Sequence, residues 1–268
     1  MNALGISPSP LFCPTIPDDL VVGAPRMGKY ELGFAANLTE LKAVQRLRFR
    51  VFNEELKEGL DTSRSSGLDQ DEFDLQCHHL YVRHLPTGEV IGTYRLQTQE
   101  MAELHQGFYS ATVFDLATAP PDMLKESVEL GRACIHADHR SLTVLHLLWK
   151  GIGLFSRCFG KKYLFGCCSL TSQNEEEGLQ VLRYLENHDH IHPEISILPL
   201  KTHQFSESHQ PNQAVLNPPR LMRAYLSLGA KICSSPAIDQ DFKTIDFLAL
   251  FDVSSFNSTD SAFYLFQS

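Results

Sequence analysis

Apolar residues recur along this chain at spacings that distinguish helices from strands. After Asn37 or Thr39, either of which can cap a helix, apolar side chains repeat every three to five residues as far as Gly59. This spacing is typical of an amphipathic helix. Its apolar positions are Leu38, Leu41, Val44, Leu47, Phe52 and Leu56.

Shorter apolar segments bounded by glycine, proline and asparagine predict strands. The expected strands are 30–37, 79–84, 89–97, 127–135, 163–169 and 244–251, and the further helices are 141–159, 173–187 and 219–228. Pro86-Thr87-Gly88 supplies a hairpin turn, and Asp138 or Ser141 can cap the helix that ends near 159. This order of elements predicts an α/β (α+β) fold built on one mixed sheet.

We divide the chain into three parts. Residues 1–29 are expected to form a flexible proline-rich leader, residues 30–252 one folded domain, and residues 253–268 an aromatic tail. Inside the domain, 188–219 is a long excursion rich in proline and histidine, without an assigned role.

Charge and cysteine content narrow the function classes. The 268 residues include 23 Lys+Arg and 32 Asp+Glu, for a formal net charge of −9. Such a chain without a basic tract lacks the footprint of nucleic-acid binding, so we expect no nucleic-acid partner. No apolar run approaches the ~20 residues that span a bilayer, and the leader lacks the basic-then-apolar order of an export signal. Seven cysteines without a CxxC pair favour reduced thiols and a cytoplasmic protein.

The segment Glu129-Leu130-Gly131-Arg132 places two ionisable side chains in an otherwise apolar strand. Residues three apart face opposite sides of a sheet unless a bulge near Gly131 redirects one of them. Buried charges are costly unless they are paired or used in chemistry. One interpretation is an internal ion pair between sheet and helix. The other is an active-site carboxylate, Glu129, with Arg132 positioning a substrate or a neighbouring acid.

Further charges lie in the first half of the chain. Arg46 and Arg50 share a helix face, while Arg48 points elsewhere, and Arg95 lies inside a strand. An acidic loop follows, with Asp69, Asp71, Glu72 and Asp74. Beside basic side chains this loop can form a pocket for the ammonium and carboxylate groups of an amino acid. Solvated surface charge is the alternative, and the EF-hand spacing for calcium is not matched.

The sequence contains no pattern typical of a metal site or of a catalytic nucleophile. His188, His190 and His192 alternate, but no carboxylate completes a zinc pattern, so we expect no metal site. The chain has no GxSxG motif, and Cys167-Cys168 has no histidine nearby in sequence, which disfavours a covalent intermediate.

Several segments, taken in order, resemble one known family. Residues 47–55 read LRFRVFNEE and are similar to the LRxRVFxEE opening of the ornithine-acyl-carrier-protein N-acyltransferases. Other matching segments are 71–74 (DEFD), 92–96 (GTYRL), 108–110 (FYS), 114–116 (FDL), 129–132 (ELGR) and parts of 229–242. The resemblance covers about 30–252. This group is a branch of the GNAT-like acyltransferases, includes long-chain N-acyl amino acid synthases, and is similar to acyl-homoserine-lactone synthases.

The resemblance implies a GNAT fold and an N-acyltransferase. The reaction it implies moves a long acyl chain, 3-hydroxylated or not, from acyl carrier protein to the α-amino group of an amino acid such as ornithine, giving an N-acyl amino acid or lyso-ornithine lipid. Positions shared with the lactone-synthase pattern, where they shape the acceptor and donor pockets, are Arg48, Phe52, Asp71, Asp74, Arg95, Phe114, Glu129 and Arg132. Among these, we expect Glu129 to be the catalytic base and Arg132 to orient it or the acceptor carboxylate. No cofactor is expected to stay bound.

Two departures from related patterns bear on the substrates. Where lactone synthases carry a tryptophan after the VF segment, this chain has Leu56-Lys57-Glu58, which argues against S-adenosylmethionine. The glycine-rich loop with which acetyltransferases hold the diphosphate of coenzyme A is replaced by a segment beginning Arg140-Ser141. A helix N-terminus with these two side chains can still hold one phosphate, as phosphopantetheine presents. We therefore expect acyl-ACP, rather than acyl-CoA, as donor substrate.

The expected partners are acyl carrier protein and an amino-acid acceptor. An acidic carrier protein would dock on a basic helix face, for which the candidates are Arg140, Lys150, Arg157, Lys161 and Lys162. If ornithine is the acceptor, Asp69 or Glu72 can bind its side-chain ammonium. An acyl-homoserine-lactone synthase, a short-chain acyl-CoA N-acetyltransferase and a non-catalytic binding protein remain open alternatives. So does peripheral contact with the inner membrane face for product release.

Overall fold

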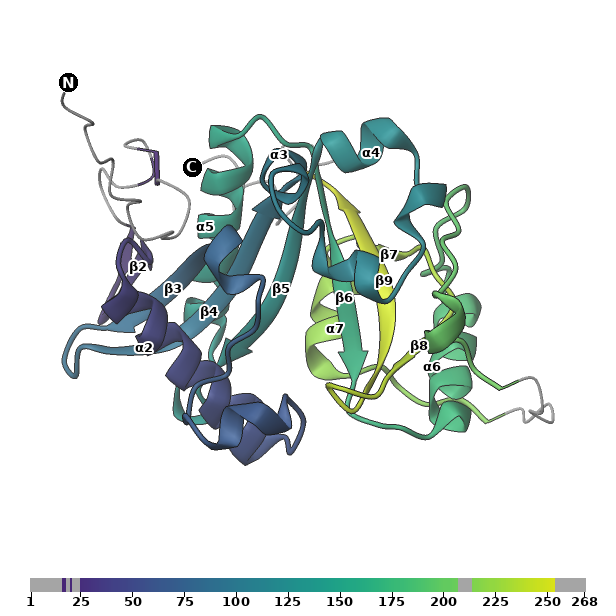
Figure 1. Ribbon diagram of the computed structural model, residues 1–268, viewed down its shortest axis with the longest axis horizontal. Helices are drawn as coiled ribbons and strands as arrows, with labels where there is room; N and C mark the ends of the chain where they lie inside the picture. Colours follow the sequence, from purple (N-terminus) through teal and green to yellow (C-terminus); the bar gives the residue numbers. More distant parts are fainter. Residues whose placement is uncertain (1–15, 18–19, 21–24, 207–213, 254–268) are drawn as a thin grey trace, which may run out of the picture.

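The computed structural model describes residues 16–17, 20, 25–206 and 214–253. Within these residues nine strands form one sheet in the order β1-β2-β3-β4-β5-β6-β9-β7, with β8 also paired to β9 (Figure 1). Only β5 and β6 pair in parallel; the other pairs are antiparallel. The strands are β1 (Arg26–Met27), β2 (Tyr30–Phe34), β3 (His78–His84), β4 (Glu89–Thr98), β5 (Ser127–Ile135), β6 (Tyr163–Leu170), β7 (Lys231–Ile232), β8 (Ala237–Asp239) and β9 (Thr244–Asp252).

Helices cover both faces of this sheet. The α-helices are α2 (Leu38–Arg48), α3 (Gln99–Glu103), α4 (Pro121–Lys125), α5 (Leu142–Cys158), α6 (Glu175–Asn187) and α7 (Arg220–Ser227). A π-helix, η1 (Phe49–Glu55), continues α2, and short 3-10 helices are η2 (Asp61–Arg64), η3 (Asp74–Gln76), η4 (Tyr109–Thr112), η5 (Leu116–Thr118), η6 (Ala137–His139) and η7 (Lys201–His203). No helix of the described residues is both long and apolar enough to cross a bilayer.

The alternation of side chains along the strands divides the core into two layers. Leu80 and Val82 of β3 pack with α5, whereas Tyr81 between them packs with α2, so these helices lie on opposite faces of the sheet. Further clusters place α6 and α7 on the α5 face, and the segment between β4 and β5 on the α2 face. We refer to these as the α5 face and the α2 face.

Local sequence features explain most element boundaries. Asn37 caps α2 by accepting the N–H of Glu40 at 3.0 Å, and Ser141, not Asp138, caps α5 through the N–H of Val144. The hairpin of β3 and β4 and the central strand Ser127–Ile135 are confirmed. The first helix does not stay α-helical to Gly59, because it changes to π geometry at Phe49.

The sequence missed three short strands. β1 pairs with β2 ahead of Tyr30, where we expected order to begin, and β7 and β8 each pair with β9 near the end of the domain. The described parts of the 188–219 excursion are mostly loop, joined to the sheet through single bridges such as Ile197 to Ser234. The aromatic tail beyond 253 and most of the leader lie outside the described residues.

The two parallel strands separate soon after they meet. They pair from Ser127 with Tyr163 to Glu129 with Phe165, and then diverge to leave a V-shaped gap in the sheet (Figure 1). At the apex, a Cβ on Gly166 would lie 2.1 Å from the carbonyl oxygen of Leu130. The apex therefore requires glycine at 166.

We expect Gly166→Ala to lower the free energy of unfolding by about 1–3 kcal/mol, because the added methyl group forces the two strands apart. Urea unfolding followed by circular dichroism measures the change. Gly131→Ala in β5 is the control, since its Cβ would meet only ordinary contacts at 3.9 Å or more. Equal stability of Gly166→Ala and the wild type would contradict a close contact at the apex.

Candidate active site

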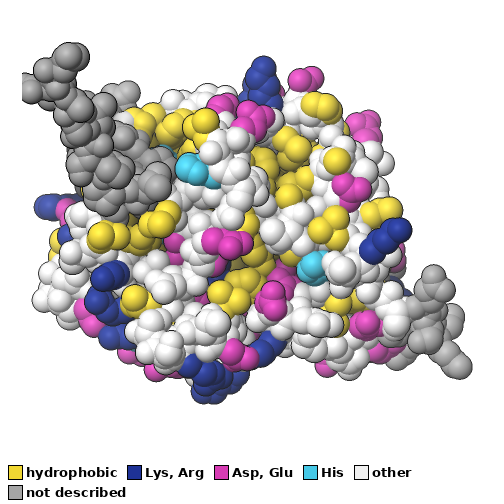
Figure 2. Space-filling model, viewed as in Figure 1, with side chains coloured by type: hydrophobic (Ala, Val, Ile, Leu, Met, Phe, Trp, Pro, Cys, Tyr) yellow, Lys and Arg dark blue, Asp and Glu magenta, His cyan; other side chains and the backbone are white. Residues whose placement is uncertain are grey.

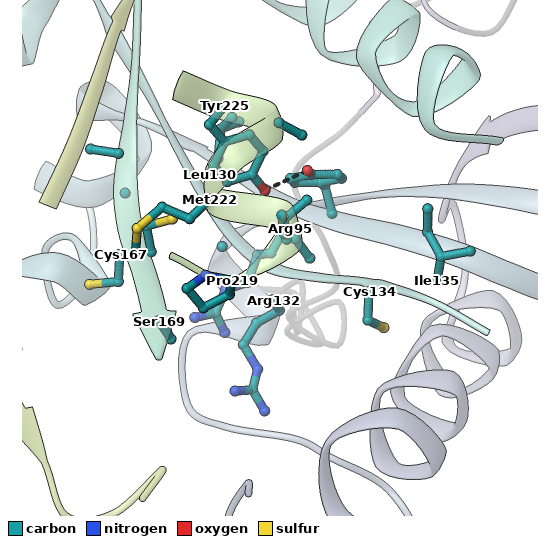
Figure 3. Close-up of a pocket in the computed structure, with 18 of the residues that line it drawn as sticks. Arg95, Leu130, Arg132, Cys134, Ile135, Cys167, Ser169, Pro219, Met222 and Tyr225 are labelled. Atoms are coloured by element: carbon teal, nitrogen blue, oxygen red, sulfur yellow. Dashed lines mark hydrogen bonds between the residues drawn. The ribbon is translucent and has the colours of Figure 1, made fainter. Parts of the chain in front are cut away.

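A cavity of about 690 Å³ occupies the gap between β5 and β6. Its lining comes from both faces of the sheet: Trp149 and Tyr225 approach from the α5 face, while Tyr109 and Asp246 approach from the α2 face. Figure 3 shows Met222 and Tyr225 on one side of this pocket and Arg132 extending at another. The pocket therefore passes through the sheet, with an apolar part against α5 and α7 and a charged part on the α2 face.

A bulge in β5 turns Arg132 toward the charged part. β4 residues Thr93 and Arg95 pair with Cys134 and Gly131, so Tyr94 alone opposes two residues of β5. Arg132, one of those two, has a φ of 49°, and the alternation of β5 resumes one residue late. Glu129 and Arg132 therefore share the α2 face, although a regular strand would separate them.

Two aromatic rings and a carboxylate hold the redirected arginine. The guanidinium carbon of Arg132 lies 4.7 Å from the ring centre of Phe52 and 4.4 Å from that of Phe242. One terminal nitrogen of Arg132 donates to Asp69. The Nε–H of Arg132 is buried and has no hydrogen-bond partner among the described residues. Phe52 is on the π-helix η1, a geometry that is frequent at functional sites.

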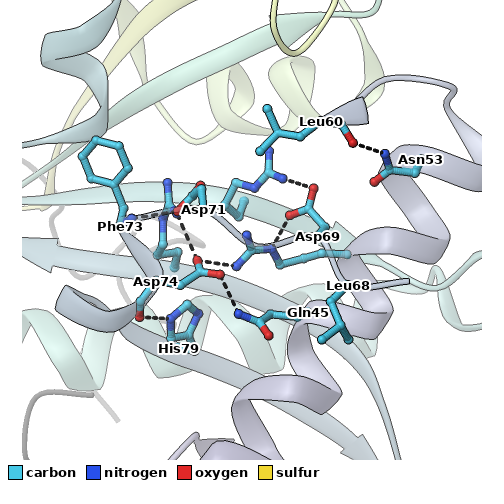
Figure 4. A network of polar contacts seen from close by, with 12 residues as sticks. Gln45, Asn53, Leu60, Leu68, Asp69, Asp71, Phe73, Asp74 and His79 are labelled. Atoms are coloured by element: carbon cyan, nitrogen blue, oxygen red, sulfur yellow. Dashed lines mark hydrogen bonds and ion pairs between the residues drawn. The ribbon is translucent and has the colours of Figure 1, made fainter. Parts of the chain in front are cut away.

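The acidic loop forms a closed network with buried arginines (Figure 4). Arg48 donates to Asp69 at 2.8 Å and to Asp74 at 2.7 Å. Arg95 donates to Asp71 at 2.5 Å and to Asp74 at 3.1 Å. Because these carboxylates are already satisfied by arginines, the loop does not form the open amino-acid pocket that the sequence suggested.

Opposite charges in this network shift the pKa values of Asp74 and Arg48 toward their charged forms. Burial alone would raise the pKa of Asp74, but Arg48 and Arg95, with His79, outweigh it and hold that pKa well below its usual range. Arg48 is fully buried, and nearby Asp74 and Asp69 outweigh its burial and raise its pKa. Asp74 and Arg48 therefore stay charged at neutral pH.

Glu129 is fixed by the backbone of another segment. Its two carboxylate oxygens accept the N–H groups of Tyr109 at 3.0 Å and Ser110 at 2.6 Å. Burial raises the pKa of Glu129, although these hydrogen bonds act in the opposite direction. Glu129 lines the pocket, but the ion pair of Arg132 is with Asp69. The expected orientation of Glu129 by Arg132 is therefore replaced by orientation through the backbone at 109–110.

Two carboxylates of the pocket were missed in the sequence. Asp246 on β9 is buried, accepts the Thr244 hydroxyl at 3.0 Å, and has a pKa that burial and nearby Asp239 raise to about 6. Glu58 follows η1, where positive φ values at Lys57 and Gly59 turn the chain sharply, and burial raises its pKa to about 7. Asp246 is a charge inside an apolar strand, the same pattern that drew attention to Glu129.

Only some of the other site residues expected from the sequence line the pocket. Phe52, Arg95, Arg140 and Ser141 line the pocket, whereas Arg48, Asp71, Asp74 and Phe114 do not. Phe114 is fully buried in the core between the sheet and the 99–125 segment. Arg140 pairs with Glu55 at 2.6 Å.

Lys161 and Lys162 do not join Arg140. They follow the C-terminal end of α5, a 17-residue helix whose N-terminus carries Ser141, so about 24 Å of helix separates the two places. Lys161 is buried and binds Glu100 at 2.6 Å, and Lys162 pairs with Glu126 at 2.8 Å. The single basic docking face expected on this helix is wrong, because these lysines are distant from the pocket and already paired.

The described part of the site contains neither a metal-binding cluster nor an ionised thiol. The described residues contain no group of three His, Cys, Asp or Glu side chains placed to hold a metal ion. Cys167 lines the pocket, but burial raises its pKa well above the usual value, so it remains a thiol at neutral pH.

Comparison with known proteins places the chain in a family. An "Acetyltransferase (GNAT) domain" family model matches residues 47–150. An L-ornithine N(alpha)-acyltransferase of Brucella abortus (strain 2308) is 31% identical over 262 residues, which cover 92% of this chain and 92% of that protein. The chain belongs to the family of the L-ornithine N(alpha)-acyltransferases. A second member, from Rhizobium meliloti (strain 1021), is 32% identical over 85% of this chain and 81% of its own length.

Membership of this family identifies the chain as an N-acyltransferase. Its fold is also that of FeeM, an N-acyl amino acid synthase from uncultured soil microbes, with a TM-score of 0.50 and 11% identity over 84% of this chain and 91% of that one. The expected GNAT fold is thus confirmed.

We expect Asp74→Asn to lower the free energy of unfolding by about 3–5 kcal/mol at pH 7, because Arg48 and Arg95 lose a shared counter-charge. The folded-state pKa of Asp74 is depressed, so its contribution is complete above the unfolded pKa of ~3.9 and is lost as the pH falls below it. Denaturant unfolding at several pH values measures this. Exposed Glu72→Gln in the same loop is the control; a constant difference down to pH 2 would contradict the ionic explanation.

Proposed function

We propose that this N-acyltransferase moves a long-chain acyl group from an acyl-carrier-protein thioester to the α-amino group of L-ornithine. The observation that carries the proposal is the pocket through the sheet, which is apolar on the α5 face and charged on the α2 face. An acyl chain fits the first part, and a charged amino acid fits the second. The acceptor is suggested by the names of the relatives.

The N-terminus of α5 supports a carrier-bound donor. Ser141 and Arg140 line the pocket there, and the sequence between β5 and α5 has no glycine to let the backbone surround a diphosphate. One phosphate, as on phosphopantetheine, suits a helix end with one hydroxyl and one guanidinium. Leu142, which is exposed beside them and lines the pocket, is available to the acyl-pantetheine arm.

The chemistry is a direct transfer between two bound substrates. The neutral α-amine attacks the thioester carbonyl carbon, a C–N bond forms, the C–S bond breaks, and the amine proton ends on the departing thiol. Backbone N–H groups of β5 beyond the apex have no β6 partner and are available to the oxyanion.

Glu129 is the proposed base for the α-ammonium group, directly or through one water. It lines the pocket at the apex, where the acyl and amino-acid parts meet, and its raised pKa brings it toward the pH at which a base is effective. Each carboxylate oxygen accepts one backbone N–H and retains a further lone pair for a substrate proton.

An exposed apolar rim suits release of a lipid product. Leu56, Leu142 and Leu221 are exposed large side chains that all border the pocket. Figure 2 shows hydrophobic side chains gathered down the middle of one face, with acidic groups beside them. We propose that an N-acyl product leaves from this rim to a membrane surface.

Purified enzyme with L-ornithine and a series of donors tests the proposed reaction. We expect kcat/KM for long-chain acyl-ACP to exceed that for the matching acyl-CoA by at least tenfold, with N-acylornithine identified by mass spectrometry. Acetyl-CoA is the short-chain comparison. Equal efficiency with acetyl-CoA would contradict both the long chain and the carrier protein.

We expect Glu129→Gln to lower kcat by ~10²-fold and to remove the part of the kcat/KM pH profile that follows Glu129 deprotonation. Because that pKa is raised by burial, activity of the wild type should increase as the pH rises through it. A merely structural role in holding residues 109–110 would lower activity without changing the profile. Thermal unfolding of both proteins provides the control for folding.

A further inference from the structure

We propose that Asp246 and Glu58 form the subsite that recognises the cationic side chain of the acceptor, while Arg132 binds its α-carboxylate. The proposal rests on the amino-acid acylation proposed above and deepens it by assigning acceptor specificity to named residues. The ligand class is an α-amino acid with an ammonium group at the end of a short aliphatic side chain.

Asp246 is a buried carboxylate that faces the pocket without a counter-ion. It lines the cavity and is 2% exposed. Its hydrogen-bond partners are the neutral hydroxyls of Thr244 and Ser169, and it forms no ion pair with any described lysine or arginine. The buried aspartates of the network, by contrast, each bind an arginine. Burying a carboxylate without an ion-pair partner costs free energy, and the ammonium group of a ligand would provide the opposite charge.

Glu58 brings a second carboxylate to the same part of the pocket. It also lines the cavity, and its contact is with the Thr171 hydroxyl at 3.4 Å. Burial raises the pKa of both Glu58 and Asp246, and both pKa values are lowered by the charge of Arg132, which places the three groups in one electrostatic neighbourhood. An ammonium between the two carboxylates would favour their charged forms.

Unpartnered donors in the same pocket point independently to an anionic group on the ligand. The Arg132 side chain is 10% exposed, lines the cavity, and keeps its Nε–H unpaired. Arg95, 3% exposed, also lines the cavity, and one of its terminal nitrogens has no hydrogen-bond partner in the part of the chain that the structure describes. Buried guanidinium donors seldom remain unsatisfied, so an acceptor such as a carboxylate is missing from their environment.

Together these groups complement a dibasic amino acid. Arg132 is already neutralised in part by Asp69, whereas Asp246 and Glu58 form no ion pair with a lysine or arginine among the described residues. Asp69 and Glu72, the acids first considered for this role, do not line the pocket: Asp69 is occupied by Arg48 and Arg132, and Glu72 is exposed. We therefore assign recognition of the side-chain ammonium to Asp246 on β9 and to Glu58 in the turn after η1.

L-norvaline provides the comparison acceptor, because it has the length of ornithine without the terminal ammonium. For the wild type we expect a clear preference for ornithine, measured as the ratio of the two kcat/KM values with one acyl-ACP. Asp246→Asn and Glu58→Gln should each lower this ratio by at least about tenfold, the size expected for one charged hydrogen bond. Exposed Glu54→Gln, in η1, is the matched control and should keep the wild-type ratio.

An ornithine-to-norvaline ratio that is unchanged in both variants would overturn the proposal. This includes the case in which a variant loses activity equally with both acceptors, because such a loss indicates a structural role. Thermal unfolding identifies a variant that fails to fold, and the less buried Glu58→Gln then decides. Calorimetric titration of ornithine and norvaline separates this proposal from the proposed reaction. Preferential binding of ornithine that is lost in the variants supports the subsite even if no acyl transfer occurs; equal binding of both amino acids contradicts it.

Discussion

The position of the site depends on one loop that neutralises buried arginines. Asp69, Asp71 and Asp74 compensate guanidinium groups from α2, β4 and the β5 bulge, and none of these arginines could remain buried without such partners. The loop thus joins three elements that are distant in the sequence. Through Asp69 it also fixes where the bulge presents Arg132, so the network supports the pocket wall without lining the pocket at Asp69, Asp71 or Asp74.

The pocket itself results from a geometric mismatch between neighbouring strands. β5 and β6 come together closely at Gly166, and their pairing then stops, while the bulge in β5 twists that strand away and turns Arg132 to the α2 face. A gap in the middle of a sheet exposes backbone groups that a continuous sheet would pair. In the acyl transfer proposed above, such N–H groups would be available to the thioester oxygen as it develops negative charge.

Much of this arrangement could be predicted from the sequence, and the rest depended on contacts between distant segments. Periodicity and capping residues predicted the long helices and central strands, and the charged pair in β5 left open the bulge that the structure shows there. The sequence could not show that Asp71 and Asp74 bind Arg48 and Arg95, because a solvated loop, a calcium loop and an internal network share one composition. Nor could it bring Asp246 and Glu58 to the same pocket, since their proximity depends on the pairing of β6 with β9. Lys161 seemed a surface charge by type, yet tertiary packing buries it against Glu100.

The divergence of β5 and β6 also determines how an elongated molecule can leave. Because the strands remain unpaired from the apex onward, no hydrogen-bonded ladder between β5 and β6 closes the passage through the sheet on that side. In the binding mode proposed above, the acyl chain lies on the α5 face and the polar head on the α2 face. A product bound in this way would not have to be pulled lengthwise past the close contact at Gly166, because it could move sideways between the separated strands.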